Sequence, residues 1–345
     1  MKKVTVAMSG GVDSSVCASL LQEKGYDVKG AIMRLHKGAK NDIDDALRVC
    51  RHLGIPLEIY DFTEEFDREV IDRFCRDYGS NLTPNPCIYC NNALKFGAFL
   101  HRALDDGCDL IATGHYARII EENGRYTLHT ACNKDKDQSY VLYGMTQFAL
   151  AHTLFPLGEY ESKEEIRSYA AEKGLPCAYR TDSQDICFIP DGDHAKFIES
   201  RGIVLPEGDF VDTHGNILGT HKGRLHYTLG QRRGLGIAKG ERVFVVDKNA
   251  SDNTVVIGSE SDLMKSGIVC TSVNFSAIDA LIKPLSCQVK IRYRKAASPA
   301  VISPCENGVI CRFDVPQRAP VAGQAAVFYI GDTVIGGGII SQVLP

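Results

Sequence analysis

The loop after the first apolar run constrains this chain more than any other segment. Residues 9–15 read Ser-Gly-Gly-Val-Asp-Ser-Ser, directly after the apolar run 4–8, and a helical pattern opens at once. Glycines let the backbone approach an anion closely, and the start of a helix presents unpaired N–H groups and a positive dipole end. The loop therefore suits a phosphate or pyrophosphate group, although a strand-to-helix turn without a ligand has the same general form.

Two common nucleotide-binding loops do not match this segment. It has no Walker A lysine and is shorter than a Walker A loop, and it lacks the third glycine of a dinucleotide fingerprint. It resembles instead the loop of the ATP pyrophosphatases, which cleave ATP between the α and β phosphates and leave AMP on an oxygen of the substrate. The resemblance implies that Gly10, Gly11, Val12, Asp13 and Ser14 cradle pyrophosphate and that Asp13 helps to hold Mg²⁺.

Length, charge and cysteine content narrow the class of protein. A chain of 345 residues suggests two or three domains, and a net charge of −4 argues against a uniformly basic nucleic-acid binder. Residues 264–345 nevertheless carry a net charge of +4, which is compatible with RNA. No apolar stretch approaches the ~18 residues of a membrane span, and the run after Met1-Lys2-Lys3 is too short for a signal peptide, so we expect a cytoplasmic protein without a membrane partner. In a reducing compartment, some of the 13 cysteines should be catalytic or metal-binding.

The first 115 residues alternate short apolar runs with helical patterns. This alternation predicts right-handed βαβ units and a parallel sheet, on which ligands bind beyond the carboxyl ends of the strands. Ser9, Met33 and Gly114 fall at such ends. The expected strands are 4–8, 28–33, 57–60 and 109–113; the expected helices are 14–24, 42–53, 64–78, 91–106 and 163–173; a hairpin is expected over 116–130.

From about residue 204 the pattern changes to short alternating runs with Gly and Pro turns, which predicts a small barrel. Runs such as 242–247 and 254–258 belong to this pattern. The segment 286–295 alternates most cleanly and predicts one strand. Its inward face would carry Cys287, Val289, Ile291 and Tyr293, and its exposed basic face Gln288, Lys290, Arg292 and Arg294.

Three cysteines stand in segments that suggest chemistry. Cys87 and Cys90 form a Cys-x-x-Cys after two prolines, just before the helix expected from Asn91. A thiol at a helix N-terminus has a lowered pKa, which would make it reactive. Two cysteines that only pack in the core would give the same sequence pattern. Cys187 follows a polar stretch at the mouth of a short apolar strand and taken alone would be a packing residue. The other ten, including Cys17, Cys50, Cys108 and Cys177, mostly fit core positions.

An ATP-activating loop and a reactive thiol in one chain suggest sulfur transfer. ATP would adenylate a carbonyl oxygen, and a persulfide sulfur would replace that oxygen at the same carbon. Such a route needs one thiol to carry the sulfur and a second thiol to release it.

The whole chain resembles the tRNA-specific 2-thiouridylases, the bacterial MnmA family, which replace the C2 oxygen of uridine 34 by sulfur in tRNAs for Lys, Glu and Gln. The resemblance implies a Rossmann-like parallel-sheet ATP pyrophosphatase domain, a small central domain and a C-terminal antiparallel β-barrel, which we place at residues 1–203, 204–263 and 264–345. It rests on residues 7–15, 83–91, 112–118, 135–140, 181–190, 227–236 and 292–293.

The resemblance also implies roles for the matched residues. Cys90 would be the nucleophile, Cys187 would carry the persulfide, and a transient disulfide between them would require a reductant. Cys187 would receive its sulfur from a donor such as a cysteine desulfurase or a sulfur-relay protein. ATP would contact Ala7, Met8, Ser9, Gly10, Gly11, Val12, Asp13, Ser14, Met33 and Gly114. Asn85, Pro86 and Cys87 would line the pocket for the flipped-out base, and the anticodon stem-loop would contact His115, Lys136, Asp137, Gln138, Arg292, Tyr293 and Gln324.

Read without the resemblance, several of these residues have a structural alternative. His115 at a strand end is as plausible a structural hydrogen-bonding group as an RNA contact. The segment 135–138 is typical of a solvated turn. Arg232 and Arg233, between glycines, would suit a phosphate or a plain surface loop.

One departure from the family leaves the mechanism open. Well-known members have an aspartate, a candidate general base, where this chain has Cys87. A thiolate or a water could replace that base, or no base is needed. Three thiolates from Cys87, Cys90 and Cys187 could also hold a [4Fe–4S] cluster with one iron open for sulfur. Other functions also stay open: an ATP pyrophosphatase ligase acting on a small molecule, a non-catalytic tRNA-binding protein, or a paralogue that acts on a different uridine or sulfur donor.

Overall fold

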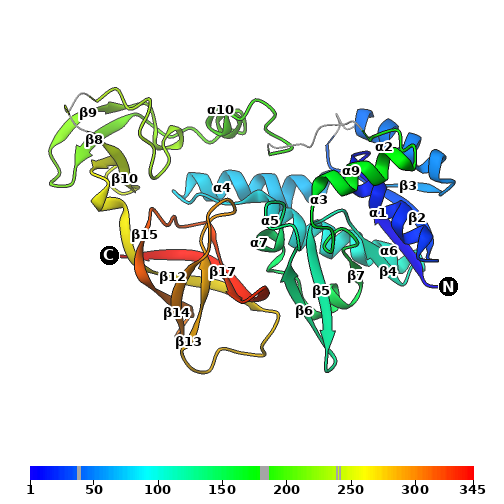
Figure 1. The fold of residues 1–345 in the computed structure, drawn as a ribbon. Helices are drawn as coiled ribbons and strands as arrows, with labels where there is room; N and C mark the ends of the chain where they lie inside the picture. The colour runs from blue at the N-terminus through cyan, green and yellow to red at the C-terminus, as the bar shows by residue number, and fades with distance from the viewer. Residues whose placement is uncertain (37–39, 179–185, 238–239, 241) are drawn as a thin grey trace.

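The computed structural model describes all residues except 37–39, 179–185, 238–239 and 241. In the described residues the strands form three sheets: a parallel sheet, a small mixed sheet and a large antiparallel sheet. Figure 1 shows the parallel sheet and its helices at the N-terminal end, the barrel below and the small sheet above it. This arrangement confirms the expected α/β fold with a central domain and a C-terminal β-barrel, while the boundaries at residues 203 and 263 stay predictions.

The parallel sheet follows the alternation of the sequence. Its five strands pair in parallel in the order β3-β2-β1-β4-β7. Alternate residues of β1 enter different cores, Val4 and Val6 on one side and Ala7 on the other, so helices cover both faces. The strands are β1 (Lys3–Ala7), β2 (Asp27–Arg34), β3 (Leu57–Asp61), β4 (Leu110–Ala112) and β7 (Thr153–Leu154).

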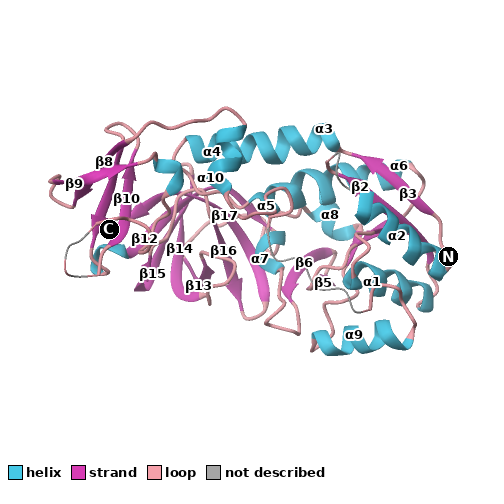
Figure 2. Ribbon diagram, turned by 90° about the horizontal axis from the view of Figure 1, so that it is seen from above, coloured by secondary structure: helices cyan, strands magenta, loops and turns pink. Residues whose placement is uncertain are grey.

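Helices contribute to both cores (Figure 2). The core beside α1 contains residues of α2 and α9, and the opposite core contains the two long helical rods 63–79 and 86–105. The helices are α1 (Val12–Glu23), α2 (Lys40–Leu53), α3 (Thr63–Phe66), η1 (Asp67–Asp72), α4 (Arg73–Gly79), α5 (Pro86–Tyr89), η2 (Cys90–Ala98), α6 (Phe99–Asp105), α7 (Ser139–Leu142), α8 (Gln147–Ala151), α9 (Lys163–Glu172) and α10 (His194–Ser200).

The second rod begins earlier than the sequence pattern predicts. Pro86 occupies the first helical position, and the Asn85 side chain caps the helix by accepting a hydrogen bond of 3.1 Å from the Cys87 N–H. The expected start near Asn91 is therefore wrong by five residues, because the Asn85 cap and Pro86 begin the helix before its apolar pattern does. The middle of the rod, Cys90–Ala98, is a π-helix, a form that often marks functional sites.

Six antiparallel strands close the barrel through the pairing of β12 with β17. The expected hairpin of β5 and β6 is confirmed, but it does not stand alone. Leu128 of β6 pairs with Val334 of β17, so the hairpin extends the barrel sheet and ties it to the α/β part. The strands are β5 (Ala117–Glu122), β6 (Arg125–Thr130), β12 (Met264–Phe275), β13 (Leu285–Lys290), β14 (Ser298–Cys305), β15 (Gly308–Arg318), β16 (Ala325–Ile330) and β17 (Thr333–Leu344).

The strand expected over 286–295 ends at Lys290. Arg292 and Tyr293 lie in the turn that follows, so the alternation does not set their orientation. Tyr293, expected inside, is 36% exposed. Arg292, expected on an open basic face, is partly buried, and its Nη2 donates a hydrogen bond of 2.5 Å to the Ala319 carbonyl.

The small sheet pairs in the order β10-β11-β8-β9 around the buried Phe210, Val255 and Ile257. Its strands are β8 (Gly208–Asp212), β9 (Ile217–His221), β10 (Phe244–Asn249) and β11 (Thr254–Gly258), with the 3₁₀ turns η3 (Arg224–His226) and η4 (Ser261–Leu263) nearby. No helix of the described ranges is long and apolar enough to cross a membrane.

A substitution at Gly114 tests how closely the end of β4 packs against the start of α1. A Cβ at Gly114 would lie 2.8 Å from the Asp13 carbonyl carbon and 2.9 Å from the Ser14 nitrogen, so backbone must move. Gly114→Ala should destabilise the domain by about 1–3 kcal/mol and lower its Tm by about 3–10 °C in thermal unfolding.

Gly79→Ala is the matched control, because its Cβ would only touch the Ile203 side chain at 3.4 Å. Its Tm should stay unchanged or rise slightly. Equal Tm values for the two variants would contradict the close approach of β4 to α1.

Candidate functional site

The phosphate loop joins β1 to α1 and leaves the start of α1 open. Gly10 has φ +70° and a Cβ there would lie 2.5 Å from the Asp45 Cβ, so a glycine is required. The Ser14 and Ser15 hydroxyls donate to the Gly11 carbonyl, at 3.2 and 2.8 Å. Among the described residues, none accepts a hydrogen bond from the N–H groups of Val12, Asp13 and Ser14 at the start of α1, and these donors suit a phosphate.

Asp13, in the first turn of α1, is held by two residues that are distant in sequence. Its Oδ1 accepts hydrogen bonds from the Tyr116 hydroxyl at 2.7 Å and from the Lys163 ammonium at 2.5 Å. Lys163 is only 7% exposed and begins α9. No described residue donates to Asp13 Oδ2, which leaves one carboxylate oxygen for a cation that arrives with a nucleotide.

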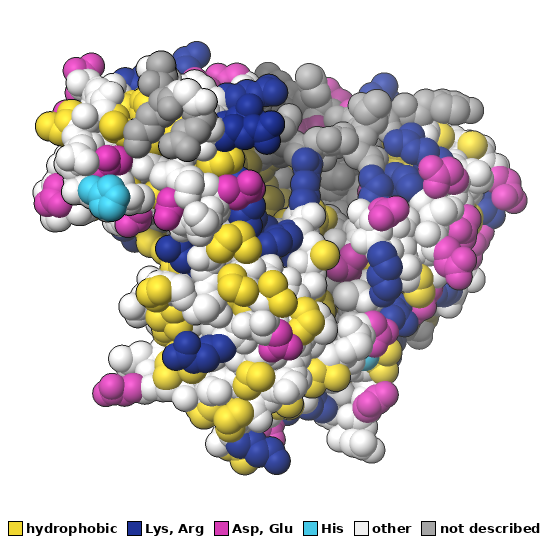
Figure 3. Space-filling view, turned by 60° about the vertical axis from the view of Figure 1, so that its left-hand side comes forward, with side chains coloured by type: hydrophobic (Ala, Val, Ile, Leu, Met, Phe, Trp, Pro, Cys, Tyr) yellow, Lys and Arg dark blue, Asp and Glu magenta, His cyan; other side chains and the backbone are white. Residues whose placement is uncertain are grey.

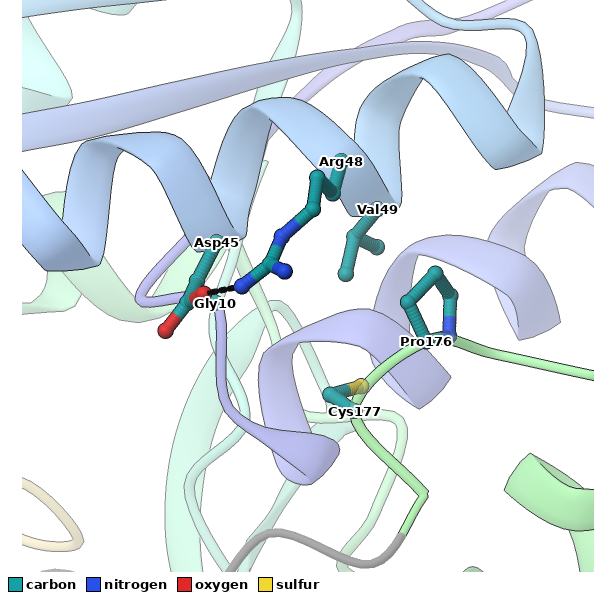
Figure 4. Close-up of a pocket in the computed structure, with 6 residues that line it drawn as sticks. All are labelled: Gly10, Asp45, Arg48, Val49, Pro176 and Cys177. Atoms are coloured by element: carbon teal, nitrogen blue, oxygen red, sulfur yellow. Dashed lines mark hydrogen bonds and ion pairs between the residues drawn. The ribbon is translucent and has the colours of Figure 1, made fainter.

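A pocket of about 160 Å³ lies against the loop (Figure 4). Gly10 forms one wall, Asp45, Arg48 and Val49 of α2 form another, and the remainder comes from Pro176 and Cys177. Arg48 forms an ion pair with Asp45 one turn away along the α2 wall. The pocket adjoins the phosphate loop, as the rule for parallel sheets requires.

The carboxyl end of β4 connects the loop to the thiols. Gly114 packs against Asp13 and Ser14, and the next residue, His115, lies 3.4 Å from the Lys95 ammonium through its Nε2. Lys95 stands on the same helical rod as Cys90, five residues further along η2. The i→i+5 hydrogen-bonding pattern of a π-helix brings residues with this spacing onto neighbouring turns.

His115 is a neutral imidazole. Burial and the Lys95 charge hold its pKa well below the ordinary value. Because an ammonium can only donate, Nε2 accepts from Lys95, so Nδ1 carries the proton and donates to Thr113 Oγ1 at 2.7 Å. This bonding fits the structural alternative for His115; its predicted tRNA contact stays a prediction.

The three candidate cysteines lie in one charged neighbourhood. Cys87 and Cys187 are exposed, and Cys90 is buried. The thiols of Cys87 and Cys90 and the Lys95 ammonium all lie near enough to influence the pKa of the Cys187 thiol. Cys187 lies in a turn, and residues 188–190 do not form the short strand at whose mouth the sequence placed it. The neighbouring Phe188 anchors that turn among the rings of Phe66, Phe74 and Phe197.

The expectation of a lowered thiol pKa at the helix start is wrong. Loss of solvation among protein atoms raises the pKa of Cys87 and Cys90, although Lys95 opposes the shift. The same cause, with the charges of Cys90 and Cys87, raises the pKa of Cys187 to about 11. The first turn of the helix and one lysine do not outweigh desolvation, so all three thiols are protonated at neutral pH.

The three candidate cysteines are not arranged to share one metal ion in the described residues, and the iron–sulfur alternative stays a prediction. Across the described ranges, no three His, Cys, Asp or Glu side chains lie close enough together to hold a metal ion. Cys87, Cys90 and Cys187 are all described, so they do not form such a set.

The segment 136–138, expected to contact tRNA, is partly buried and hydrogen-bonded to neighbouring segments of the chain. Asp137 is 9% exposed, and its Oδ1 and Oδ2 accept hydrogen bonds from the Ala131 N–H and the Ser139 hydroxyl. Gln138 exchanges backbone and side-chain hydrogen bonds with Tyr116, at 2.8 and 2.9 Å. The prediction of a solvated turn is therefore wrong for Asp137. The neighbouring Lys136 is partly exposed.

Two candidate residues of the barrel, Tyr293 and Gln324, lie beside the segments that contain Asp137 and Cys87. The Tyr293 ring lies 6.0 Å from the Tyr140 ring, and the charges of Asp137 and Cys87 act on its hydroxyl. Gln324 donates a hydrogen bond of 2.7 Å to the Thr83 carbonyl, which fixes the loop before Asn85 and Pro86. Figure 3 shows Lys and Arg side chains gathered around a hollow between the lobes of the molecule.

Two residues of this site were missed in the sequence. Lys95 lies in an ordinary helical pattern, and its nearness to His115 depends on the packing of η2 against the end of β4. Lys163 begins a helix 150 residues from Asp13. The polar segment before Cys187 falls largely on 179–185, outside the described residues.

The comparisons with known proteins cover almost the whole chain. Family models match a tRNA methyl transferase HUP domain at residues 2–191, a tRNA methyl transferase PRC-barrel domain at 195–259 and an aminomethyltransferase β-barrel domain at 265–340. The chain is 47% identical to a tRNA-specific 2-thiouridylase MnmA of Clostridium perfringens over 99% of each chain. It is 47% identical to that of Clostridium acetobutylicum over 98% of this chain and 99% of the relative, and 46% identical to that of Clostridioides difficile over 99% of each.

Replacing Lys95 should make the neighbouring thiols harder to ionise. Lys95→Met removes the charge that lowers the pKa of Cys87, Cys90 and Cys187. Alkylation of the exposed Cys187 by iodoacetamide at pH 8, followed by peptide mass spectrometry, should slow roughly three- to tenfold, and the rate should recover at higher pH.

Lys134→Met is the control, since Lys134 donates to Thr130 and does not act on these thiols. An unchanged alkylation profile in the Lys95 variant would show that its charge does not reach Cys187.

Proposed function

Because the chain belongs to the MnmA family of tRNA-specific 2-thiouridylases, which are tRNA sulfurtransferases, we propose that it converts the C2 oxygen of uridine 34 to sulfur in tRNAs for Lys, Glu and Gln. One observation supports this most directly. The end of β4 contacts both the phosphate loop, through Gly114, and the thiol-bearing helical rod, through His115 and Lys95. Activation by ATP and transfer of sulfur can therefore occur next to each other.

The first step adenylates the uracil. ATP arrives as its Mg²⁺ complex, with phosphates at the open start of α1 and Asp13 Oδ2 toward the cation. The uridine O2 attacks the α phosphorus, the bond from that phosphorus to the bridging oxygen breaks, and pyrophosphate leaves with the electron pair. Loss of the N3 proton makes the adenylated ring neutral. Ala7, Met8, Ser9, Met33 and Gly114 complete the proposed ATP contacts.

The second step replaces oxygen by sulfur. The terminal sulfur of a Cys187 persulfide attacks C2, and the C2–O bond breaks as AMP leaves with the oxygen. The Cys90 thiol then loses its proton to solvent, and the resulting thiolate attacks the Cys187 sulfur, which breaks the S–S bond and leaves the outer sulfur on C2. A Cys90–Cys187 disulfide results, and an external dithiol supplies the two electrons that reopen it.

Cys87 does not supply a strong base in place of the family aspartate. Its pKa is raised, so the thiol is protonated at neutral pH and cannot accept the N3 proton. We therefore propose that water takes that proton. The role of Cys87 is to line the base pocket with Asn85 and Pro86, whose positions the helix cap and the first helical turn determine.

The tRNA and the sulfur donor approach the same opening. We propose that the anticodon stem-loop contacts the turn at Arg292 and Tyr293 with His115, Lys136 and Gln324 nearby, while Asp137 and Gln138 support that surface from within. Cys187 is exposed, so a cysteine desulfurase or sulfur-relay protein can reach it. The target base leaves its stack to enter the pocket.

Cys187→Ser should separate the two steps. Pyrophosphate release with tRNA and ATP should continue, while formation of 2-thiouridine, measured by mass spectrometry of digested tRNA, should fall to background because no persulfide can form.

Cys305→Ser is the control, because Cys305 is another exposed cysteine, located on the barrel strand β14. It should leave both steps unchanged. Normal thiolation by the Cys187 variant would end the persulfide assignment.

A further inference from the structure

The phosphate loop of this chain contains no cation. Residues 9–15 have no Lys or Arg, and the Walker A lysine that neutralises phosphates in other nucleotide loops is missing. The α1 dipole and the first-turn N–H groups supply only partial charges. Cleavage of ATP between the α and β phosphates places additional negative charge on the departing pyrophosphate, which a full positive charge from the protein would stabilise in addition to Mg²⁺.

Lys163 lies where that charge is needed. Its ammonium contacts Asp13 Oδ1 in the first turn of α1 and lies 5.6 Å from the centre of the Tyr116 ring. The Tyr116 hydroxyl contacts the same carboxylate oxygen. The three side chains are thus locked together beside the loop.

The position of Lys163 is unfavourable for ordinary stability. It is the first residue of α9, where the helix dipole opposes a cation, and at 7% exposure it is buried far more than most lysines. The Ser162 side chain caps α9 itself, and the hydrogen bond of 2.9 Å between the Ser19 and Tyr169 hydroxyls holds α9 on α1. A chain that needed only this helix pair would not require a buried cation at that end.

We infer that Lys163 is the phosphate-binding cation of the ATP site, supplied from α9 in place of a loop lysine, with Asp13 and Tyr116 as its positioning residues. The ammonium has three donors, so it can donate to a phosphate oxygen while Asp13 still holds it. Asp13 then has two functions, since Oδ1 orients Lys163 and Oδ2 faces the cation of MgATP. The inference rests on the proposed function, because it assigns the phosphates of the same ATP.

The chain contains a matched control for this lysine. Lys173, just beyond the other end of α9, forms an ion pair with Glu23 at the far end of α1. Lys163–Asp13 and Lys173–Glu23 therefore join the same two helices at opposite ends, and only the first pair lies at the phosphate loop. A purely structural role predicts that loss of either lysine changes the Tm and leaves the binding and release of pyrophosphate unchanged.

The test uses the full chain with MgATP, tRNA and inorganic pyrophosphate as probes. Lys163→Met should slow single-turnover pyrophosphate release about 100-fold or more and remove the rise in Tm that magnesium pyrophosphate gives the wild type, with tRNA affinity unchanged. Lys173→Met should keep both properties. Tyr116→Phe should lose only several-fold in rate, because Lys163 remains.

Lys163→Gln keeps a hydrogen-bond donor to Asp13 but removes the positive charge. It tests the role of Lys163 in phosphate binding if the Met variant does not fold. Pyrophosphate binding and release at the wild-type level in the folded Lys163 variant would overturn the inference. A wild type that releases no pyrophosphate with tRNA would instead overturn the proposed function, while pyrophosphate binding would still test Lys163.

Discussion

The contacts at the carboxyl end of β4 hold this site together. Within four residues, Thr113 to Tyr116, the chain packs against the start of α1, fixes a neutral histidine beside Lys95 and donates a hydrogen bond to Asp13. β4 is buried and pairs with β1, so these contacts are rigid. The phosphate loop and the thiol-bearing rod therefore both pack against one short segment.

Desolvation sets the chemistry of the thiols more than the helix does. Cys87 and Cys90 stand in the first two turns of a helix, where the dipole favours a thiolate, and yet their pKa values are raised because packed atoms exclude water. Lys95 opposes that effect from the next turn. The thiols are thus held protonated, and ionisation depends on charge brought close to them, which makes Lys95 the residue on which their reactivity depends most.

Much of the fold could be predicted from the sequence, because it is encoded locally. Strands β1 to β4 and helices α1 and α9 follow from periodicity and from the glycine loop, and the strand-rich C-terminal third predicts a barrel. The pairing of β6 with β17 could not be predicted, since nothing in either strand identifies its partner. The alternation over 286–295 failed at Lys290 because a turn there, stabilised by Arg292 on Ala319, replaces the strand. Likewise, the contact of Lys163 with Asp13 arises only when α9 packs on α1.

The central claim is that this chain transfers sulfur through thiols that do not form a metal site. Anaerobic purification, followed by iron and sulfide analysis and by ATP-dependent thiolation of tRNA on the same sample, tests it most directly. Full thiolation without bound iron is the result that the arrangement of Cys87, Cys90 and Cys187 predicts. Near-stoichiometric iron that rises and falls with activity would contradict the account and would make these three cysteines cluster ligands.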